Sequence, residues 1–141
     1  MERIKIKYLR DIPKLKKINV GDWIDLYCGE DIFLRPDEAT IIPLGVAMEL
    51  PEGYEAIVVP RSSTFRKYNI LMTNSLGVID NSYCGNADEW GFPCLAINFT
   101  QIPKGARIAQ FRIIKNQPEI KFETVDFLTG SNRGGFGSTG K

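Results

Sequence analysis

The stretch Leu76–Gly85 reads Leu-Gly-Val-Ile-Asp-Asn-Ser-Tyr-Cys-Gly and places a single acid between an apolar run and a turn. Its apolar first half suits a buried strand, whereas Asn81-Ser82 favour a turn, so the sequence predicts a hairpin here. Such a hairpin would present a carboxylate, Asp80, and an aromatic ring, Tyr83, to a pocket. On these residues alone, the plainer interpretation is that Asp80 only starts the turn, as Asp often does.

The length and composition of the chain indicate one ordinary globular domain. Its 141 residues are 43% hydrophobic and 25% charged, which is enough for a real core. The net charge of +1 gives no electrostatic reason to expect a long nucleic acid or an anionic membrane surface as a partner. The charged N-terminus and the lack of any long apolar run predict a cytoplasmic protein. We expect its three cysteines to be reduced thiols, because they are odd in number and lack close paired spacing.

The chain contains no histidine. This excludes a Ser-His or Cys-His nucleophile pair and a His-ligated zinc site, so a carboxylate is the expected general base. For a hydrolase, the expected cofactor is a hard cation. Mg²⁺ prefers oxygen ligands and is often held mainly by substrate phosphates and water, so it needs no dedicated cluster of protein ligands.

Short strand-like segments recur between turn residues, and no segment keeps a helical period over three turns. The sequence therefore predicts an all-β fold, a sandwich or a jelly roll. The only plausible helical turn is Arg61–Tyr68. Outside the opening stretch, the expected strands are Arg3–Tyr8, Trp23–Cys28, Ile32–Leu34, Thr40–Ile42, Val46–Leu50, Tyr54–Val59, Leu95–Phe99 and Arg107–Lys115.

The last residues of the chain form a compositionally separate segment. Residues 129–141 contain five glycines and one aromatic residue, so they cannot bury enough surface to order themselves. We expect a β domain over residues 1–128 and a flexible lid over 129–141. The text from Gly135 matches the start of a phosphate-binding P-loop, but it lacks the final Ser/Thr and the following helix. Glycine amides and Arg133 can still wrap a polyphosphate, and Phe136 can cover a flat ring.

Five segments in order resemble the five motifs of the trimeric dUTPase family: Gly21–Gly29, Pro60–Phe65, Asn74–Gly85, Pro103–Phe111 and Arg133–Gly140. The most specific parts are Pro-Arg-Ser-Ser, Gly-Val-Ile-Asp-x-x-Tyr and Gly-Gly-Phe-Gly-Ser-Thr-Gly. The resemblance implies a β jelly-roll-like subunit in a homotrimer with active sites at subunit interfaces. It also implies hydrolysis of dUTP to dUMP and pyrophosphate with Mg²⁺.

By this resemblance, Asp80 would activate the water that attacks the α-phosphorus, and Tyr83 would lie beneath the deoxyribose. The backbone around Gly77 and Ile79 would read uracil, and Asn74 would contact the nucleoside. A ring against C2′ excludes a ribose hydroxyl, and a tight backbone near C5 excludes the thymine methyl.

The other motifs imply contacts to the phosphates. Asp25 would reach Mg²⁺ through water. The remaining residues that would hold the phosphates, order the site or stack on uracil are Arg61, Ser62, Ser63, Gln110, Arg133, Phe136, Gly137, Ser138 and Thr139. Plainer interpretations stay open for two of these residues, since Arg61 could form an ion pair that links subunits and Asp25 could simply end a strand.

Three features depart from the family pattern. Cys84 replaces an arginine that usually follows the tyrosine, and Arg133 stands one residue closer to the following glycines than usual. The segment Asn86–Pro93 is an insertion resembling a phage and prophage subgroup, and its Trp90 and Phe92 could cover the site or fill a gap at a subunit interface.

Two alternative functions remain compatible with the sequence. A dCTP deaminase of the same fold would have to recruit Glu89 from the insertion. A non-catalytic regulatory protein, switched by a nucleotide and acting on a protein partner, would keep the same pocket.

Overall fold

The computed structural model describes residues 1–137, so Ser138 and Thr139 lie outside the described residues. Within this range the chain forms eleven strands and one short helix, and the all-β prediction is confirmed. The elements in order are β1 (Lys5–Tyr8), β2 (Ile24–Tyr27), β3 (Ile32–Leu34), β4 (Ala39–Pro43), β5 (Val46–Glu49), β6 (Tyr54–Pro60), α1 (Thr64–Tyr68), β7 (Ile70–Met72), β8 (Gly77–Ile79), β9 (Gly91–Ala96), β10 (Thr100–Ile102) and β11 (Arg107–Lys115). The helix lies within the expected segment.

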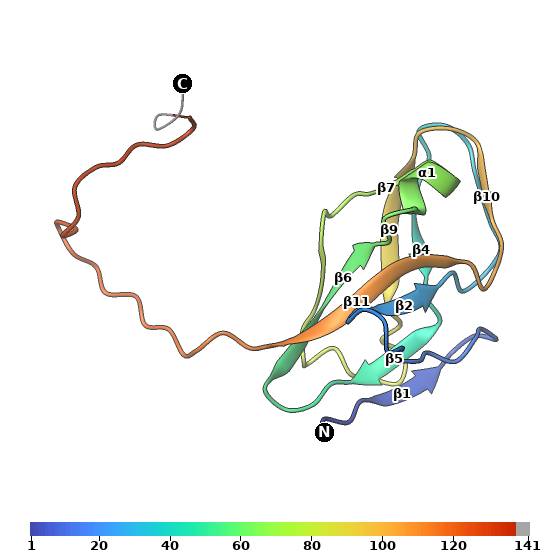
Figure 1. The fold of residues 1–141 in the computed structure, drawn as a ribbon, viewed down its shortest axis with the longest axis horizontal. Helices are drawn as coiled ribbons and strands as arrows, with labels where there is room; N and C mark the ends of the chain where they lie inside the picture. Colours follow the sequence, from blue (N-terminus) through green and yellow to red (C-terminus); the bar gives the residue numbers. More distant parts are fainter. Residues whose placement is uncertain (138–141) are drawn as a thin grey trace.

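The strands pair in four antiparallel groups (Figure 1). A four-stranded sheet has the order β2-β11-β6-β8, and a three-stranded sheet has the order β4-β9-β7. Two further pairs are β1 with β5 and β3 with β10. The long strand β11 lies between β2 and β6, so it connects segments that are far apart in the sequence. The four-stranded sheet carries Asp25, Gly77, Ile79 and Gln110 among the predicted site residues.

The core is a single cluster of apolar side chains contributed by most of the strands. Trp90 and Phe92 are 1% and 0% exposed, and the Trp90 ring meets the edge of Phe111 at 5.1 Å between centroids. Trp90 also lines a hollow beside Asp80, but neither side chain is exposed enough to face a neighbouring subunit. They fill the interior of this one, where a large aromatic side chain contributes most to burial.

The three cysteines are free thiols, as expected, with Cys28 and Cys94 buried and Cys84 exposed. Burial raises the pKa of the Cys28 and Cys94 thiols to about 11, because the apolar surroundings disfavour the thiolate. Neither buried thiol is therefore a reactive nucleophile.

The opening stretch folds differently from the expected hairpin. β8 pairs with β6 alone, and no strand follows the turn before Gly91, so the hairpin prediction is wrong while its turn is present. Leu76 and Val78 are 41% and 61% exposed, because they alternate with the buried Gly77 and the half-buried Ile79 and so point to the opposite face. The strand expected at Leu95–Phe99 is also misplaced, since β9 ends at Ala96.

After β11 the described chain leaves the sheets and runs as an extended segment away from the body (Figure 1). Residues 116–137 are all exposed, including the ring of Phe136. Within the part of the chain that the structure describes, no helix has the length and apolarity to cross a membrane.

Candidate functional site

Asp80 lies in a tight turn at the end of β8. Ser82 donates two hydrogen bonds to the same oxygen, Asp80 Oδ1, one from its backbone N–H at 2.8 Å and one from its hydroxyl at 2.6 Å. These bonds stabilise the charged form, first through the hydroxyl and then through the backbone, and lower the pKa of Asp80. Asp80 is therefore an ionised acceptor, and Oδ2 has no partner among residues 1–137.

The turn itself is anchored at a distance. Asn81 Nδ2 donates to the carbonyl oxygens of Pro51 and Tyr54, each at 3.0 Å. The sequence predicted a turn at Asn81-Ser82, and Asn81 ties this turn to Pro51 in the loop before β6 and to Tyr54 at the start of β6. Ser82 was not predicted as a site residue, although its position two residues after an aspartate in a turn is a recognisable signal for this contact.

A hollow of about 420 Å³ lies beside this turn. Its lining includes Asn74, Asp80 and Tyr83 together with the residues of β8 and the start of β9. The Tyr83 hydroxyl donates a 2.9 Å hydrogen bond to the Glu89 carbonyl, which fixes the far end of the ring. The structure thus brings together the three residues predicted to contact water and nucleoside.

Gly77 and Ile79 line this hollow. β8 is the last strand of its sheet, so one edge of its backbone has no strand partner in the described chain. An unpaired strand edge offers N–H and C=O groups in alternation. Gly77 is buried, and a Cβ at this position would lie 3.1 Å from Val58 Cβ, so glycine lets β8 approach β6 closely.

A second group of predicted residues lies around Asp25 on β2. Arg61 Nε contacts Asp25 Oδ1 at 2.9 Å, and an Arg107 amino group contacts Oδ2 at 3.5 Å. Gln110 is the cross-strand neighbour of Asp25 and donates to the Pro60 carbonyl at 3.1 Å. This ion pair of Arg61 lies within one chain.

Thr64 fixes the loop that carries Arg61, Ser62 and Ser63. Its hydroxyl accepts from the Arg61 N–H at 3.0 Å and donates to the Ile108 carbonyl at 2.7 Å, and the side chain is 1% exposed. Ser63 precedes α1 but makes no capping hydrogen bond through its side chain. Thr64 was missed by the sequence reasoning, because a buried threonine has no signature before the fold is known.

The two groups lie at opposite ends of β6. Ile79 pairs with Ala56, and Arg61 follows five residues later, which at ~3.3 Å a residue separates the groups by ~17 Å along the strand. The extended segment after β11, which includes Arg133 and Phe136, runs away from the sheets (Figure 1). One described chain therefore holds the hollow beside the Asp80 carboxylate and, separately, a basic cluster around Arg61 and Arg107.

Glu89 does not serve as a free acid. Both of its carboxylate oxygens are bonded to Arg10, at 2.7 and 3.2 Å, and Oε2 also accepts from the Gly45 N–H at 2.9 Å. The deaminase alternative required Glu89 to drive attack on a base. Because both carboxylate oxygens of Glu89 already accept hydrogen bonds within the fold, Glu89 is a structural residue. The deaminase alternative therefore has no candidate catalytic residue in the insertion.

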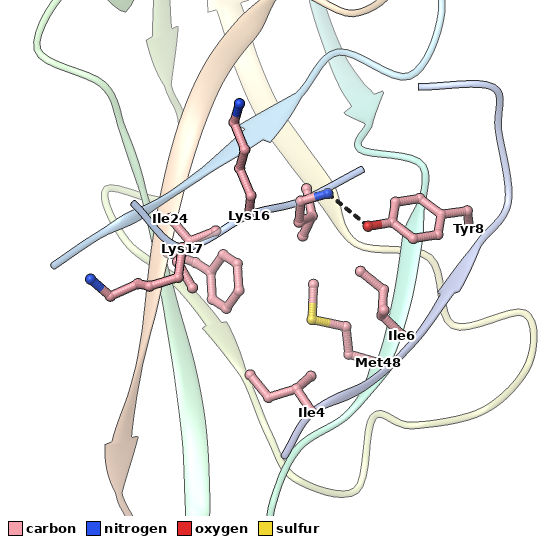
Figure 2. Close-up of a pocket in the computed structure, with 9 residues that line it drawn as sticks. Ile4, Ile6, Tyr8, Lys16, Lys17, Ile24 and Met48 are labelled. Atoms are coloured by element: carbon pink, nitrogen blue, oxygen red, sulfur yellow. Dashed lines mark hydrogen bonds between the residues drawn. The ribbon is translucent and has the colours of Figure 1, made fainter. Parts of the chain in front are cut away.

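Another hollow, of about 130 Å³, lies between β1, β5 and the segment at residues 15–17 (Figure 2). Its labelled side chains are mostly aliphatic, and Lys16 and Lys17 direct their amino groups away from them. The Tyr8 hydroxyl oxygen accepts a 2.7 Å hydrogen bond from the backbone N–H of Leu15. This hollow offers no carboxylate and contains none of the predicted site residues.

The model of the dUTPase family matches residues 21–140, most of the chain. The chain belongs to the dUTPase family. A prophage-derived deoxyuridine 5′-triphosphate nucleotidohydrolase of Bacillus subtilis is 54% identical over 139 residues, covering 98% of both chains. The fold matches a Staphylococcus bacteriophage 80alpha dUTPase mutant with dUpNHpp, with a TM-score of 0.80, 23% identity and 98% coverage of both chains. It also matches a mutant dUTPase from phage phi11 of Staphylococcus aureus with a structural Mg(II) ion, with a TM-score of 0.74, 19% identity and coverage of 89% and 97%.

The dUTPase family match raises the question of whether these residues suit Mg²⁺. Residues 1–137 contain no group of three acidic, cysteine or histidine side chains that could enclose an ion. Asp25 has both oxygens in ion pairs, but a carboxylate has about four lone-pair sites, so it retains acceptors for water. This donor set fits an ion held mainly by phosphates and water and not a closed protein cage.

Proposed function

We propose that the chain hydrolyses dUTP to dUMP and pyrophosphate as a homotrimer of jelly-roll subunits. The observation that carries this proposal is the turn at Asp80, which holds an ionised carboxylate at the mouth of the hollow beside an unpaired backbone edge. The family membership and the 54% identical nucleotidohydrolase support the same activity.

The hollow suits a deoxyuridine. Uracil presents one N–H between two carbonyl oxygens, and the free backbone edge at Gly77 and Ile79 offers acceptors and donors in alternation. The Tyr83 ring would lie beneath the deoxyribose and leave no room for a 2′-hydroxyl. Asn74, which also lines the hollow, would contact the nucleoside.

Hydrolysis requires little covalent work from the protein, because positioning and charge stabilisation dominate phosphoryl chemistry. Asp80 Oδ1 is held by Ser82, so Oδ2 is the oxygen that would orient the water and take its proton. Arg61, Ser62, Ser63 and Gln110 would hold the phosphates. Mg²⁺, held by the phosphates and reached by Asp25 through water, would neutralise charge on the departing pyrophosphate.

The separation within one chain supports a site shared between subunits. The carboxylate group and the basic group lie ~17 Å apart along β6, which is too far for one α-phosphorus to meet both. In a trimer, the Asp80 end of one subunit would face the Arg61 end of its neighbour. Residues 129–141 would then close over the site as a lid, with Arg133 and Gly137 and the undescribed Ser138 and Thr139 at the γ-phosphate and Phe136 on uracil.

The test is pyrophosphate release by the purified full-length protein with Mg²⁺, measured for dUTP, UTP, dTTP and dCTP. We expect dUTP to be turned over far faster than the other three. Ammonia release from dCTP would contradict the proposed reaction. Tight dUTP binding without turnover would instead support the nucleotide-switched regulatory protein.

A further inference from the structure

The Tyr83 ring depends on a carbonyl oxygen that is itself held in place. The Tyr83 hydroxyl donates to the Glu89 carbonyl at 2.9 Å, and this is the only hydrogen bond of that hydroxyl within residues 1–137. Tyr83 is 40% exposed, so packing alone does not fix its side chain. Its position therefore follows the position of the Glu89 backbone.

The Glu89 side chain is clamped on both oxygens. Arg10 donates from Nε to Oε2 at 2.7 Å and from an amino group to Oε1 at 3.2 Å, and the Gly45 N–H adds a 2.9 Å bond to Oε2. Such a two-pronged pair fixes direction as well as distance. The side chains of Arg10 and Glu89 are only 33% and 23% exposed, whereas those of the surface pair Arg35–Glu38 are 73% and 47% exposed at 4.0 Å.

Arg10 is itself confined. A Cβ on Gly29 would lie 2.7 Å from Arg10 Cδ, and a Cβ on Gly45 would lie 3.3 Å from Arg10 Cβ, so the arginine stem runs between two glycines. The remaining amino group contacts Glu30 at 3.1 Å. Arg10 thus links the N-terminal segment to the insertion 79 residues further along the chain.

We infer that Arg10 and Glu89 are positioning residues that hold the Tyr83 ring against the sugar and so set the preference for deoxyribose over ribose. This inference rests on the proposed function, in which Tyr83 lies beneath the deoxyribose. A ring can exclude the ribose 2′-hydroxyl sterically only if its position is fixed. The Arg10–Glu89 ion pair supplies that rigidity from outside the hollow. The insertion therefore serves specificity through Glu89 as well as stability through its buried aromatic residues.

The test compares kcat and KM for dUTP and UTP in four single variants and one double variant. Arg10→Lys keeps the charge but loses the planar fork, and Glu89→Gln keeps the shape but weakens the pair. Tyr83→Phe removes only the hydroxyl. Arg35→Lys is the matched control, because it alters an exposed ion pair of no assigned function. Circular dichroism and melting temperature establish that each variant is folded.

We expect Arg10→Lys, Glu89→Gln and Tyr83→Phe each to lower the dUTP-to-UTP ratio of kcat/KM by about tenfold, with Arg35→Lys unchanged. Combining Arg10→Lys with Tyr83→Phe should add little, because both changes release the same ring. If Tyr83→Phe lowers the ratio but neither clamp variant does, the inference is overturned and the proposed function stands. Equal loss for both nucleotides, or no effect of Tyr83→Phe, also overturns it. A wild-type protein that does not turn over dUTP would instead refute the proposed function.

Discussion

Replacing Asp80 by asparagine separates the charge of this residue from its shape. The Asn carbonyl oxygen can still accept the two hydrogen bonds from Ser82, at 2.8 and 2.6 Å, that hold the turn. The free position at Oδ2 becomes an amide nitrogen, which cannot take a proton from water. The substitution therefore removes the general base and leaves the hollow intact.

The expected size of the effect follows from these contacts. Loss of a positioned general base costs about 10²–10⁴-fold in rate, or roughly 2.7–5.4 kcal/mol of activation free energy. Asp80 is exposed, so the melting temperature should change little. Affinity for dUTP should change little, because uracil and sugar are read by the β8 backbone and Tyr83.

The assay is pyrophosphate release at saturating dUTP, with binding measured by calorimetry and folding by thermal melting. We expect a large loss in kcat with binding and melting temperature nearly unchanged. A variant that retains most of its turnover would refute the role of Asp80 as the base. A variant that loses activity only because it no longer melts cooperatively would show that the carboxylate is structural.

The other predictions concern the turn, the core and the C-terminal segment. Ser82→Ala should move the acidic limb of the kcat/KM profile to higher pH, because the Ser82 hydroxyl is the main cause of the lowered pKa of Asp80; an unmoved limb would mean that another group titrates there. Trp90→Ala should lower the free energy of unfolding by about 3–5 kcal/mol, measured by denaturant unfolding, whereas a loss below ~1 kcal/mol would contradict its core role. Deleting residues 132–141 should abolish most activity and leave the core folded. Protease cleavage within 129–141 should be suppressed by a non-hydrolysable dUTP analogue with Mg²⁺ but not by dUMP, and equal protection by dUMP would contradict closure through the outer phosphates.

Local sequence patterns were sufficient to predict the class of the fold and most strand positions. Alternating segments such as Arg107–Lys115 matched the observed strand, because side chains on a strand alternate between faces. The helical turn near Arg61 was also recognisable from its flanking proline and the break in alternation. The resemblance then identified the family through motifs whose residues do form the hollow at Asp80.

Features that depend on tertiary contacts could not be predicted. The hairpin prediction was wrong because β8 does not pair with the segment that follows its turn. It pairs with β6, which precedes α1 and β7 in the chain. The sequence predicted Trp90 and Phe92 to lie at a surface of the insertion, whereas both are buried in the core. The clamp between Arg10 and Glu89 joins residues 79 apart, and nothing in the local sequence of either indicates its partner.

The central claim is that Asp80 of one subunit works with Arg61 of another, and mixing two inactive variants tests it most directly. Asp80→Asn and Arg61→Ala proteins are unfolded together and refolded, with light scattering used to check for a mass near three times the 15.9 kDa chain. Random trimers should regain about one quarter of wild-type activity, one half times one half, because a site then needs one intact residue from each partner. A mixture of Asp25→Asn with Arg61→Ala should regain none, since both residues lie in one basic group of the same chain. No recovery in the first mixture would contradict the shared site.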